Sequence, residues 1–364
     1  MKRECRILEL GAGSYFKENG FGRVDYYQIG KKSSEEPNLT FRQFLHLRRQ
    51  LRSGRYDVVV ASFFGVCGTP WHRGRGVVSN LFKMARCCMG RFYGFGPWII
   101  LWLLQGVEVP LVVVDRKDDP CVIPPQFFGL LKKCRAYYWR ELPLKIENGF
   151  MYTDGRMEDT SAVRKTRIFC NHRHKIKPLS LGLNYDAVAK RVDFKCPKEI
   201  DVFFAGTSKG EMARESGLKI LEELKQEGLA IEILTGQTLS RQVFLEICAR
   251  SWLVYSPEGH GWDCFRHYEA CAVGSVPLIN YPRIHRHHPL IDQEHALYYG
   301  VEGSDLKRVI KTALADKDRL REMGVAARDF VLQHHTHEKL FDYILQPVMN
   351  PEDVAGWNAT HTAF

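Results

Sequence analysis

The sequence contains no apolar run long enough to cross a membrane. The best candidate, residues 94–104, supplies about half of the roughly 20 residues that a helical span needs, and Gln105 and Glu108 interrupt the segment after it. We predict that residues 94–104 form a buried helix leading to a strand. The charged N-terminus lacks the apolar core of a secretory signal peptide. These absences predict a cytoplasmic protein, with the inner face of the membrane as an alternative location.

Paired cysteine motifs are also missing. The 11 cysteines are odd in number, follow no regular spacing and include no Cys-x-x-Cys. In a chain without a signal peptide, this pattern predicts reduced thiols rather than a disulfide framework or a zinc site. Two histidine clusters are better explained as exposed polar loops than as a metal site: His285, His287 and His288, then His334, His335 and His337. We expect neither a metal nor a resident cofactor.

Composition and charge limit the class of protein. Hydrophobic residues make up 45% and charged residues 26% of the 364 residues, which is typical of a folded chain with room for two domains. Lys and Arg outnumber Asp and Glu by 52 to 42, giving a formal charge of +10. Such a field favours an anionic partner: a nucleotide diphosphate, an anionic membrane or nucleic acid. Charge alone does not choose among them.

One stretch, residues 252–279, organises the rest. An apolar run at 252–255 predicts a buried strand, and Gly259 and Gly261 follow it, where the backbone turns tightly or approaches a ligand. Residues 265–273 predict a helix that Gly274 ends, and residues 276–279 predict the next strand. The unit is therefore strand, glycine loop, helix and strand, and its loop opens onto a helix N-terminus. Such an end attracts anions.

Two side chains on this helix suit a nucleotide. Arg266 and Glu269 are three residues apart and so share a helix face. A guanidinium can hold a phosphate, and a carboxylate can accept hydrogen bonds from both hydroxyls of a ribose.

The stretch resembles the donor half of GT-B glycosyltransferases, especially the exostosin-like and CgeB-like group. The group's signature is matched by Gly261, Arg266, Tyr268, Glu269, Ala270, Gly274, Val276, Pro277 and Ile279. Residues 258–261 also resemble the Glu-Gly-x-Gly element of retaining members. In those enzymes seven residues separate two glutamates, whereas ten separate Glu258 and Glu269 here. Retention and inversion both stay open.

The resemblance covers about residues 175–345 and implies an α/β protein of the GT-B fold, with two Rossmann-like doubly wound domains facing a cleft. Residues 1–175 would form the acceptor domain, residues 176–345 the nucleotide-sugar domain, and residues 346–364 a tail crossing back to the first. The alternation of strands at 201–205 and 231–234 with helices at 211–226 and 241–249 independently predicts a doubly wound parallel sheet.

The resemblance also implies the donor site. Glu269 would grip the ribose, and the backbone near Gly259 and Gly261 would hold the diphosphate. Basic and polar residues at the same sheet edge would steady the leaving group: Thr207, Lys209, Arg214 and Arg266. His260 and Asp263 are candidates for contact with the sugar hydroxyls, although a structural role in the loop explains both residues equally well. Glu258 and His260 are the catalytic candidates on this loop.

The N-terminal half is harder to interpret. Strands are predicted at 6–10, 25–29, 56–61, 109–114 and 136–139, with a helix at 41–51. Residues 11–13 form a bare Gly-x-Gly, which is weak support for a nucleotide site. Asp115 follows a predicted strand and is a candidate general base, although a turn role explains it better. Residues 63–76 suit an acceptor site or a solvated loop. Residues 80–93 could form a basic amphipathic surface that binds a membrane or an anionic acceptor, or a partly buried helix with its charges facing solvent.

The predicted function is metal-independent transfer of a sugar from a nucleotide diphosphate sugar to a hydroxyl of a glycan, a lipid-linked molecule or another acceptor. The competing interpretation is a GT-B scaffold without turnover that binds nucleic acid or an anionic membrane. A third combines the two: sugar transfer onto modified nucleic acid.

Overall fold

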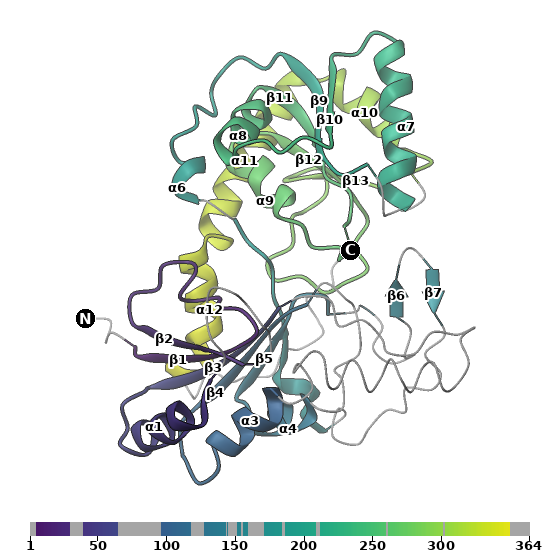
Figure 1. Ribbon diagram of the computed structural model, residues 1–364. Helices are drawn as coiled ribbons and strands as arrows, with labels where there is room; N and C mark the ends of the chain where they lie inside the picture. Colours follow the sequence, from purple (N-terminus) through teal and green to yellow (C-terminus); the bar gives the residue numbers. More distant parts are fainter. Residues whose placement is uncertain are drawn as a thin grey trace. The chain divides into compact units, whose positions relative to one another are not determined.

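The computed structural model describes residues 5–29, 39–64, 96–117, 127–142, 144, 151–153, 156–158, 171–183, 186–208, 212–259, 261–300 and 303–349. The chain divides into two compact units (Figure 1). The N-terminal unit comprises Met1–Arg140, Thr160–Leu179 and Phe341–Phe364, and the C-terminal unit comprises Glu141–Asp159 and Ser180–Leu340.

A six-stranded parallel sheet forms the N-terminal unit. Its order is β2-β1-β3-β4-β5-β8. The strands are β1 (Ile7–Gly11), β2 (Val24–Gln28), β3 (Val58–Phe64), β4 (Leu111–Arg116), β5 (Ala136–Trp139) and β8 (Ile176–Pro178). The central strands β3 and β4 carry the β-branched runs of a sheet covered on both faces. Strand β8 was not predicted, because three residues give no usable periodicity, and it extends this unit past the predicted boundary at residue 175.

Helices cover both faces of this sheet (Figure 1). One face carries α1 (Phe41–Arg52), α3 (Gly96–Leu103) and α4 (Phe128–Lys133). On the other, Phe341, Ile344 and Leu345 of α12 (His337–Met349) join Tyr15 and Phe16 over the strands. Helix α1 starts at Thr40, which forms a capping box with Gln43.

The prediction of a buried helix at 94–104 is wrong in one respect. Helix α3 buries Ile100 and Leu103, but Trp98 is 60% and Trp102 51% exposed. Every residue of α3 after Pro97 is a large apolar side chain, and only one side of the helix packs on the unit, so the side chains on the other side are exposed. No helix in the described part of the chain is both long enough and apolar enough to span a bilayer.

The C-terminal unit has a five-stranded parallel sheet of order β10-β9-β11-β12-β13. Its strands are β9 (Ile200–Gly206), β10 (Ile231–Thr235), β11 (Ser251–Tyr255), β12 (Val276–Asn280) and β13 (Leu297–Tyr299). Its helices are α6 (Asp186–Ala189), α7 (Met212–Gln226), α8 (Arg241–Ala249), α9 (Phe265–Ala272), α10 (Leu306–Leu314) and α11 (Lys317–His334). The sequence did not predict the short helices α4 and α6. It also did not predict β6 (Met151–Thr153), its antiparallel partner β7 (Arg156–Glu158) or, in the N-terminal unit, the 3₁₀ helix Arg173–Lys175.

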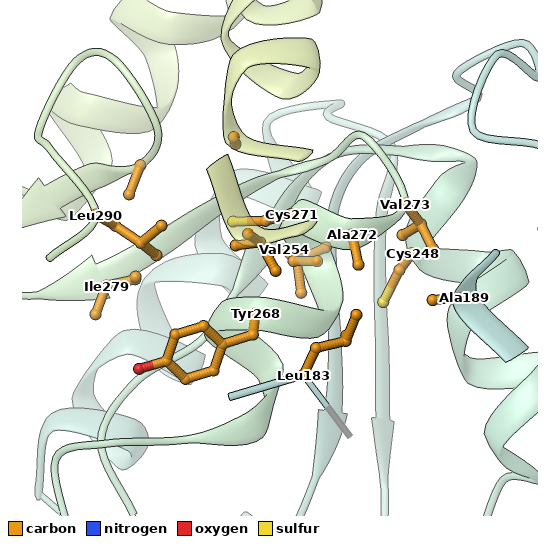
Figure 2. Close-up of a cluster of buried hydrophobic side chains, with 14 of the residues drawn as sticks. Leu183, Ala189, Cys248, Val254, Tyr268, Cys271, Ala272, Val273, Ile279 and Leu290 are labelled. Carbon is orange, nitrogen blue, oxygen red and sulfur yellow. The ribbon is translucent and has the colours of Figure 1, made fainter. Parts of the chain in front are cut away.

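Two apolar clusters sandwich this sheet. Phe203, Val254 and Ile279 face α8, α9 and part of α11. The alternate residues, including Phe204 and Tyr255, face α7 and α10. Figure 2 shows the first cluster, with Tyr268 and Cys271 of α9 beside Val254. Because helices cover both faces, the sheet is doubly wound, as predicted.

Helix α9 ends as the sequence indicates. Gly274 adopts φ +73°, and its N–H donates to Cys271 O at 2.9 Å. The next amide, of Ser275, donates to Ala270 O at 3.0 Å. These two bonds form a Schellman motif, which favours glycine at this position. The helix that carries Arg266 and Glu269 is thereby fixed in length and direction.

Candidate donor site in the C-terminal unit

The strand order of the C-terminal sheet reverses between β9 and β11. After β10 joins one side of β9, the chain crosses over and β11 joins the other side. In open parallel sheets, ligands bind beyond the carboxyl ends of the strands at such a reversal. Two described segments begin there, residues 207–208 after β9 and residues 256–259 after β11.

Arg214 joins these two segments. It lies near the start of α7 and is 8% exposed. Its Nη1 donates to Thr207 Oγ1 at 2.8 Å, and its Nη2 donates to Glu258 O at 3.2 Å. The loop backbone passes close to the guanidinium, since a Cβ built on Gly259 would be in ordinary van der Waals contact with Nη2 at 3.4 Å. The sequence-predicted residues Thr207, Arg214 and Glu258 therefore do come together.

Arg266 reaches the same sheet edge from α9. Its Nη1 donates to Ala205 O at 2.8 Å, and its guanidinium lies 5.2 Å from the centre of the Phe204 ring. A Cβ on Gly206 would approach that Nη1 to 2.8 Å, so a larger residue there would displace the guanidinium. Two arginines from two helices thus place fixed positive charge at the end of β9.

Glu269 is fully buried one helical turn after Arg266. Arg241, the first residue of α8, places Nη1 2.9 Å from Oε1 of Glu269, and the Arg241 side chain is 37% exposed. Among the described residues, neither carboxylate oxygen accepts a hydrogen bond with favourable geometry. Burial raises the pKa of Glu269 to about 7, against the opposing attraction of Arg241 and Arg266. A buried carboxylate with unused acceptor capacity requires an explanation.

Asn280, which sequence reasoning missed, holds Glu258. Asn280 is buried at the end of β12; its Oδ1 accepts from Glu258 N at 2.9 Å and its Nδ2 donates to Glu258 Oε2 at 3.1 Å. The following turn closes when Gly259 N donates to Gly261 O at 2.9 Å. The sequence did contain a clue to this role, since Asn280 is a polar residue at the end of an otherwise apolar strand, where side chains reach the sheet edge that binds ligands.

The start of α9 is fixed by polar side chains. Asp263 accepts from Leu181 N at 2.6 Å and from Tyr268 Oη at 2.7 Å. The amides of Trp262 and Asp263 donate to the Glu141 carboxylate at 2.9 and 3.2 Å. These contacts favour the structural role for Asp263. Glu141 was not predicted, because it is about 120 residues away in sequence from the loop that it holds.

His267 also has a structural place in this loop. It is buried, its Nδ1 lies 2.8 Å from Ser256 Oγ, and its Nε2 lies 3.1 Å from Trp262 O. Burial lowers the pKa of His267 to about 3, so the imidazole is neutral and links β11 to the turn before α9.

Two predicted donor-site residues, Lys209 and His260, lie outside the described residues, as do the candidate acceptor loop after residue 64 and the basic stretch 80–93. The prediction that exposed loops explain the histidine clusters is wrong for His335. That side chain is buried between Ser180 Oγ at 3.1 Å and His288 O at 2.8 Å, and burial lowers its pKa to about 3. Within the described part of the chain, no three His, Cys, Asp or Glu side chains are arranged to hold a metal.

Asp115 lies in the N-terminal unit, at the end of β4. Its Oδ2 accepts from Tyr137 Oη at 2.6 Å and lies 3.0 Å from Lys117 Nζ, while its Oδ1 accepts from Lys117 N at 3.2 Å. Both oxygens are therefore engaged within the turn that follows the strand. These contacts favour the turn role.

The Gly-x-Gly after β1 is occupied by the protein's own carboxylate. Glu9 is fully buried and accepts from Ser14 Oγ and Ser62 Oγ, each at 2.6 Å, and from the amides of Tyr15 and Phe16 at 2.5 and 3.2 Å. These are the amides that would otherwise face an anion beyond β1. The Glu9 contacts therefore leave the C-terminal sheet as the candidate place for a donor site.

Two doubly wound Rossmann-like units define the GT-B fold of glycosyltransferases, and solved structures with this fold match nearly the whole chain. An α-glucosyltransferase in complex with UDP and a 13-mer DNA matches with TM-score 0.52 and 9% identity, over 95% of this chain and 100% of that one. A glycosyltransferase from Rickettsia africae matches with TM-score 0.53 and 10% identity, over 94% and 97%. Anabaena HepE in complex with UDP matches with TM-score 0.51 and 10% identity, over 94% and 99%.

A family model supports the resemblance in the C-terminal half. Residues 190–287 match the model described as the RXYLT1 C-terminal domain, which is an exostosin-like family. The matched segment contains Thr207, Arg214, Glu258, Arg266 and Glu269. No curated protein matches the chain. The CgeB-like part of the resemblance stays a prediction.

Proposed function

We propose that this protein is a glycosyltransferase that moves a sugar from a nucleoside diphosphate sugar to a hydroxyl acceptor. The observation that carries the proposal is the convergence of Arg214, Arg266 and the buried Glu269 at the strand reversal of the C-terminal sheet. Two cations suit a diphosphate, and an unsatisfied carboxylate suits a ribose diol. The UDP-bound structures of the same fold are consistent with such a donor.

The proposed reaction breaks the bond between the anomeric carbon and the β-phosphate oxygen and forms a bond from that carbon to the acceptor oxygen. The acceptor's proton passes to a base, and the nucleoside diphosphate leaves with the bonding electron pair. Arg214 and Arg266 stabilise the charge that develops on the diphosphate. Because they supply this positive charge, the proposed mechanism needs no metal and no resident cofactor.

Glu269 accepts hydrogen bonds from the ribose in this proposal. In the structure the carboxylate of Glu269 is paired with Arg241. The incoming ribose would either bind the carboxylate together with Arg241 or displace the partly exposed guanidinium. Glu258 lies at the same sheet edge and is held by Asn280 through two hydrogen bonds. It is the catalytic candidate that the described geometry supports, while Asp115 and His260 stay predictions.

The first test is a thermal-shift screen of the full chain against a panel of nucleoside diphosphate sugars, followed by slow hydrolysis assays of the best donor without acceptor. One donor should raise the Tm and be hydrolysed. Glu269→Gln should lose both effects, and Glu222→Gln, an exposed carboxylate on α7, should keep both. A chain that binds no nucleotide sugar would remove the proposal.

A second candidate function is sugar transfer onto nucleic acid. It is favoured by the formal charge of +10, and a DNA-bound α-glucosyltransferase shares the fold. Transfer of radiolabelled sugar to DNA carrying hydroxymethylated bases, but not to unmodified DNA or to glycans, would support it. A scaffold without turnover would instead bind nucleic acid with steep salt dependence and no nucleotide preference.

A further inference from the structure

Four large apolar side chains are exposed together on the N-terminal unit. Phe41 and Leu45 of α1 are 67% and 45% exposed, and Trp98 and Trp102 of α3 are 60% and 51% exposed. Single exposed apolar residues are ordinary on protein surfaces, but several gathered on neighbouring helices mark an interaction site. We call these four residues the aromatic face.

The packing of the two helices makes the aromatic face continuous. The Phe44 ring stacks on Trp102 with centroids 4.5 Å apart and planes inclined by 29°. Arg48 Nη2 donates to Gln105 O at 3.3 Å, just beyond α3. Phe41 and Leu45 are four residues apart, as are Trp98 and Trp102, so each pair lies on one side of its helix. Figure 1 shows α1 and α3 on the same side of the sheet.

Positive charge borders the aromatic face. Arg42, Arg49 and Arg52 are exposed on α1, on the same side as Phe41 and Leu45 at 3.6 residues per turn. Neither α1 nor α3 contains an acidic residue. Within the described residues no ion pair involves these three arginines, and the nearby Asp57 already pairs with Arg6 at 3.6 Å. The charge is therefore available to a partner.

We propose that the face formed by α1 and α3 rests on an anionic lipid bilayer. Tryptophan prefers the headgroup level of a membrane, and exposed apolar side chains bordered by arginines are typical of surfaces that bind in that interface. Each arginine near an anionic surface adds attraction. A folded protein partner would need carboxylates placed opposite the arginines and a surface shaped to fit the apolar side chains. An anionic bilayer can contact both the arginines and the apolar side chains without a matching shape. The proposal does not depend on the proposed sugar transfer.

Vesicle flotation of the full chain tests the proposal. The protein should float with vesicles containing one-third phosphatidylglycerol in phosphatidylcholine and stay behind with pure phosphatidylcholine. The double charge reversal Arg42→Glu, Arg49→Glu should lower the partition coefficient at least about thirtyfold, from the roughly fivefold attraction that each arginine contributes. Raising the salt to about 1 M should have a similar effect, because screening shortens the reach of charge.

A second variant tests the apolar contribution. Trp98→Ser with Leu45→Ser should also release the protein, and lipids brominated near the headgroup should quench the tryptophan fluorescence of the unaltered chain more than that of this variant. Both positions are exposed, so the Tm should change little. Matched controls on α11 are Arg319→Glu and Val325→Ser, which replace exposed residues of the C-terminal unit. They should float normally.

The proposal is overturned if the variants float as well as the unaltered chain, or if neutral and anionic vesicles bind equally. It is also overturned if sedimentation shows that the aromatic face joins two copies of this chain and that anionic vesicles do not compete.

Discussion

Arg241 Nη1 lies 2.9 Å from Oε1 of Glu269, and this contact links the exposed start of α8 to a fully buried carboxylate on α9. The two residues are 28 apart in sequence and meet only because both helices pack on the same face of the sheet. The ion pair stabilises a charge that burial would otherwise disfavour. It leaves Glu269 with acceptor capacity for a ligand.

Replacing Glu269 by Gln should weaken nucleotide-sugar binding while keeping the fold. Hydrogen bonds to a charged group contribute about 1.5–3 kcal/mol each, so the Kd should rise at least about tenfold. Calorimetric titration measures the Kd, and circular dichroism with the Tm reports the fold. Unchanged affinity in Glu269→Gln would take this residue out of the donor site.

The affinity for a nucleotide sugar should fall as the pH drops below about 7. Burial raises the pKa of Glu269 to about 7, and only the carboxylate can accept from both ribose hydroxyls. Each pH unit below that value should therefore cost up to about tenfold in affinity. A nucleotide sugar is the right probe, since its diphosphate diester does not titrate in this range. Glu269→Gln should flatten the profile.

Arg241→Met provides the matched test, because Arg241 lowers the pKa of Glu269. Its loss should move the fall in affinity to higher pH, whereas a merely structural role would weaken binding equally at every pH.

The stability of the fold should depend on pH in the opposite direction to the affinity for the nucleotide sugar. Because folding raises the pKa of Glu269, the folded state is more stable when Glu269 is protonated, and this stability is lost as the pH rises through about 7. The Tm of the unaltered chain should therefore fall relative to that of Glu269→Gln as the pH rises from about 5 to 8.

Arg214→Ala should slow sugar transfer or donor hydrolysis more than it weakens donor binding. Arg214 bridges the segments after β9 and β11 through Thr207 and Glu258, and the proposed leaving group develops charge beside it. Loss of one such donor costs about 10²–10³ in kcat. Arg214→Lys should recover only part of the rate, since an ammonium cannot span both partners. Lys219→Ala on the exposed side of α7 serves as control; equal kcat values in all variants would contradict the role.

Glu9→Ala should destabilise the N-terminal unit without changing nucleotide affinity. The substitution leaves the buried hydroxyls of Ser14 and Ser62 and nearby amides without their acceptor. An unsatisfied buried group costs about 1–3 kcal/mol, so the Tm should drop by several degrees. Glu108→Ala, an exposed residue beyond α3, should not change it. A loss of nucleotide affinity in Glu9→Ala with the fold intact would move the donor site to the first glycine loop.

The regular elements of the C-terminal unit were predictable because local signals agree with the final packing. Helix α8 begins and ends where its periodicity indicated, and Gly274 ends α9 through a local pair of hydrogen bonds. Strand β8 was not predicted, because its three residues carry no period and its partner β5 lies about 40 residues earlier in the chain. Strands β6 and β7 pair with each other, but three residues in each are too few to show a period.

The alternation of strands and helices, the excess of basic residues and the resemblance carried by residues 258–279 can all be read from the chain without coordinates, since they depend on local order or composition. The folded chain was needed to show that Arg241, Asn280 and Glu141 hold the candidate donor-site loop and its carboxylate. It was also needed to show that Glu9 fills the first glycine turn and that two tryptophans of α3 face outward. These features depend on contacts between segments far apart in the chain, and no local pattern records which distant side chain will reach a buried polar group.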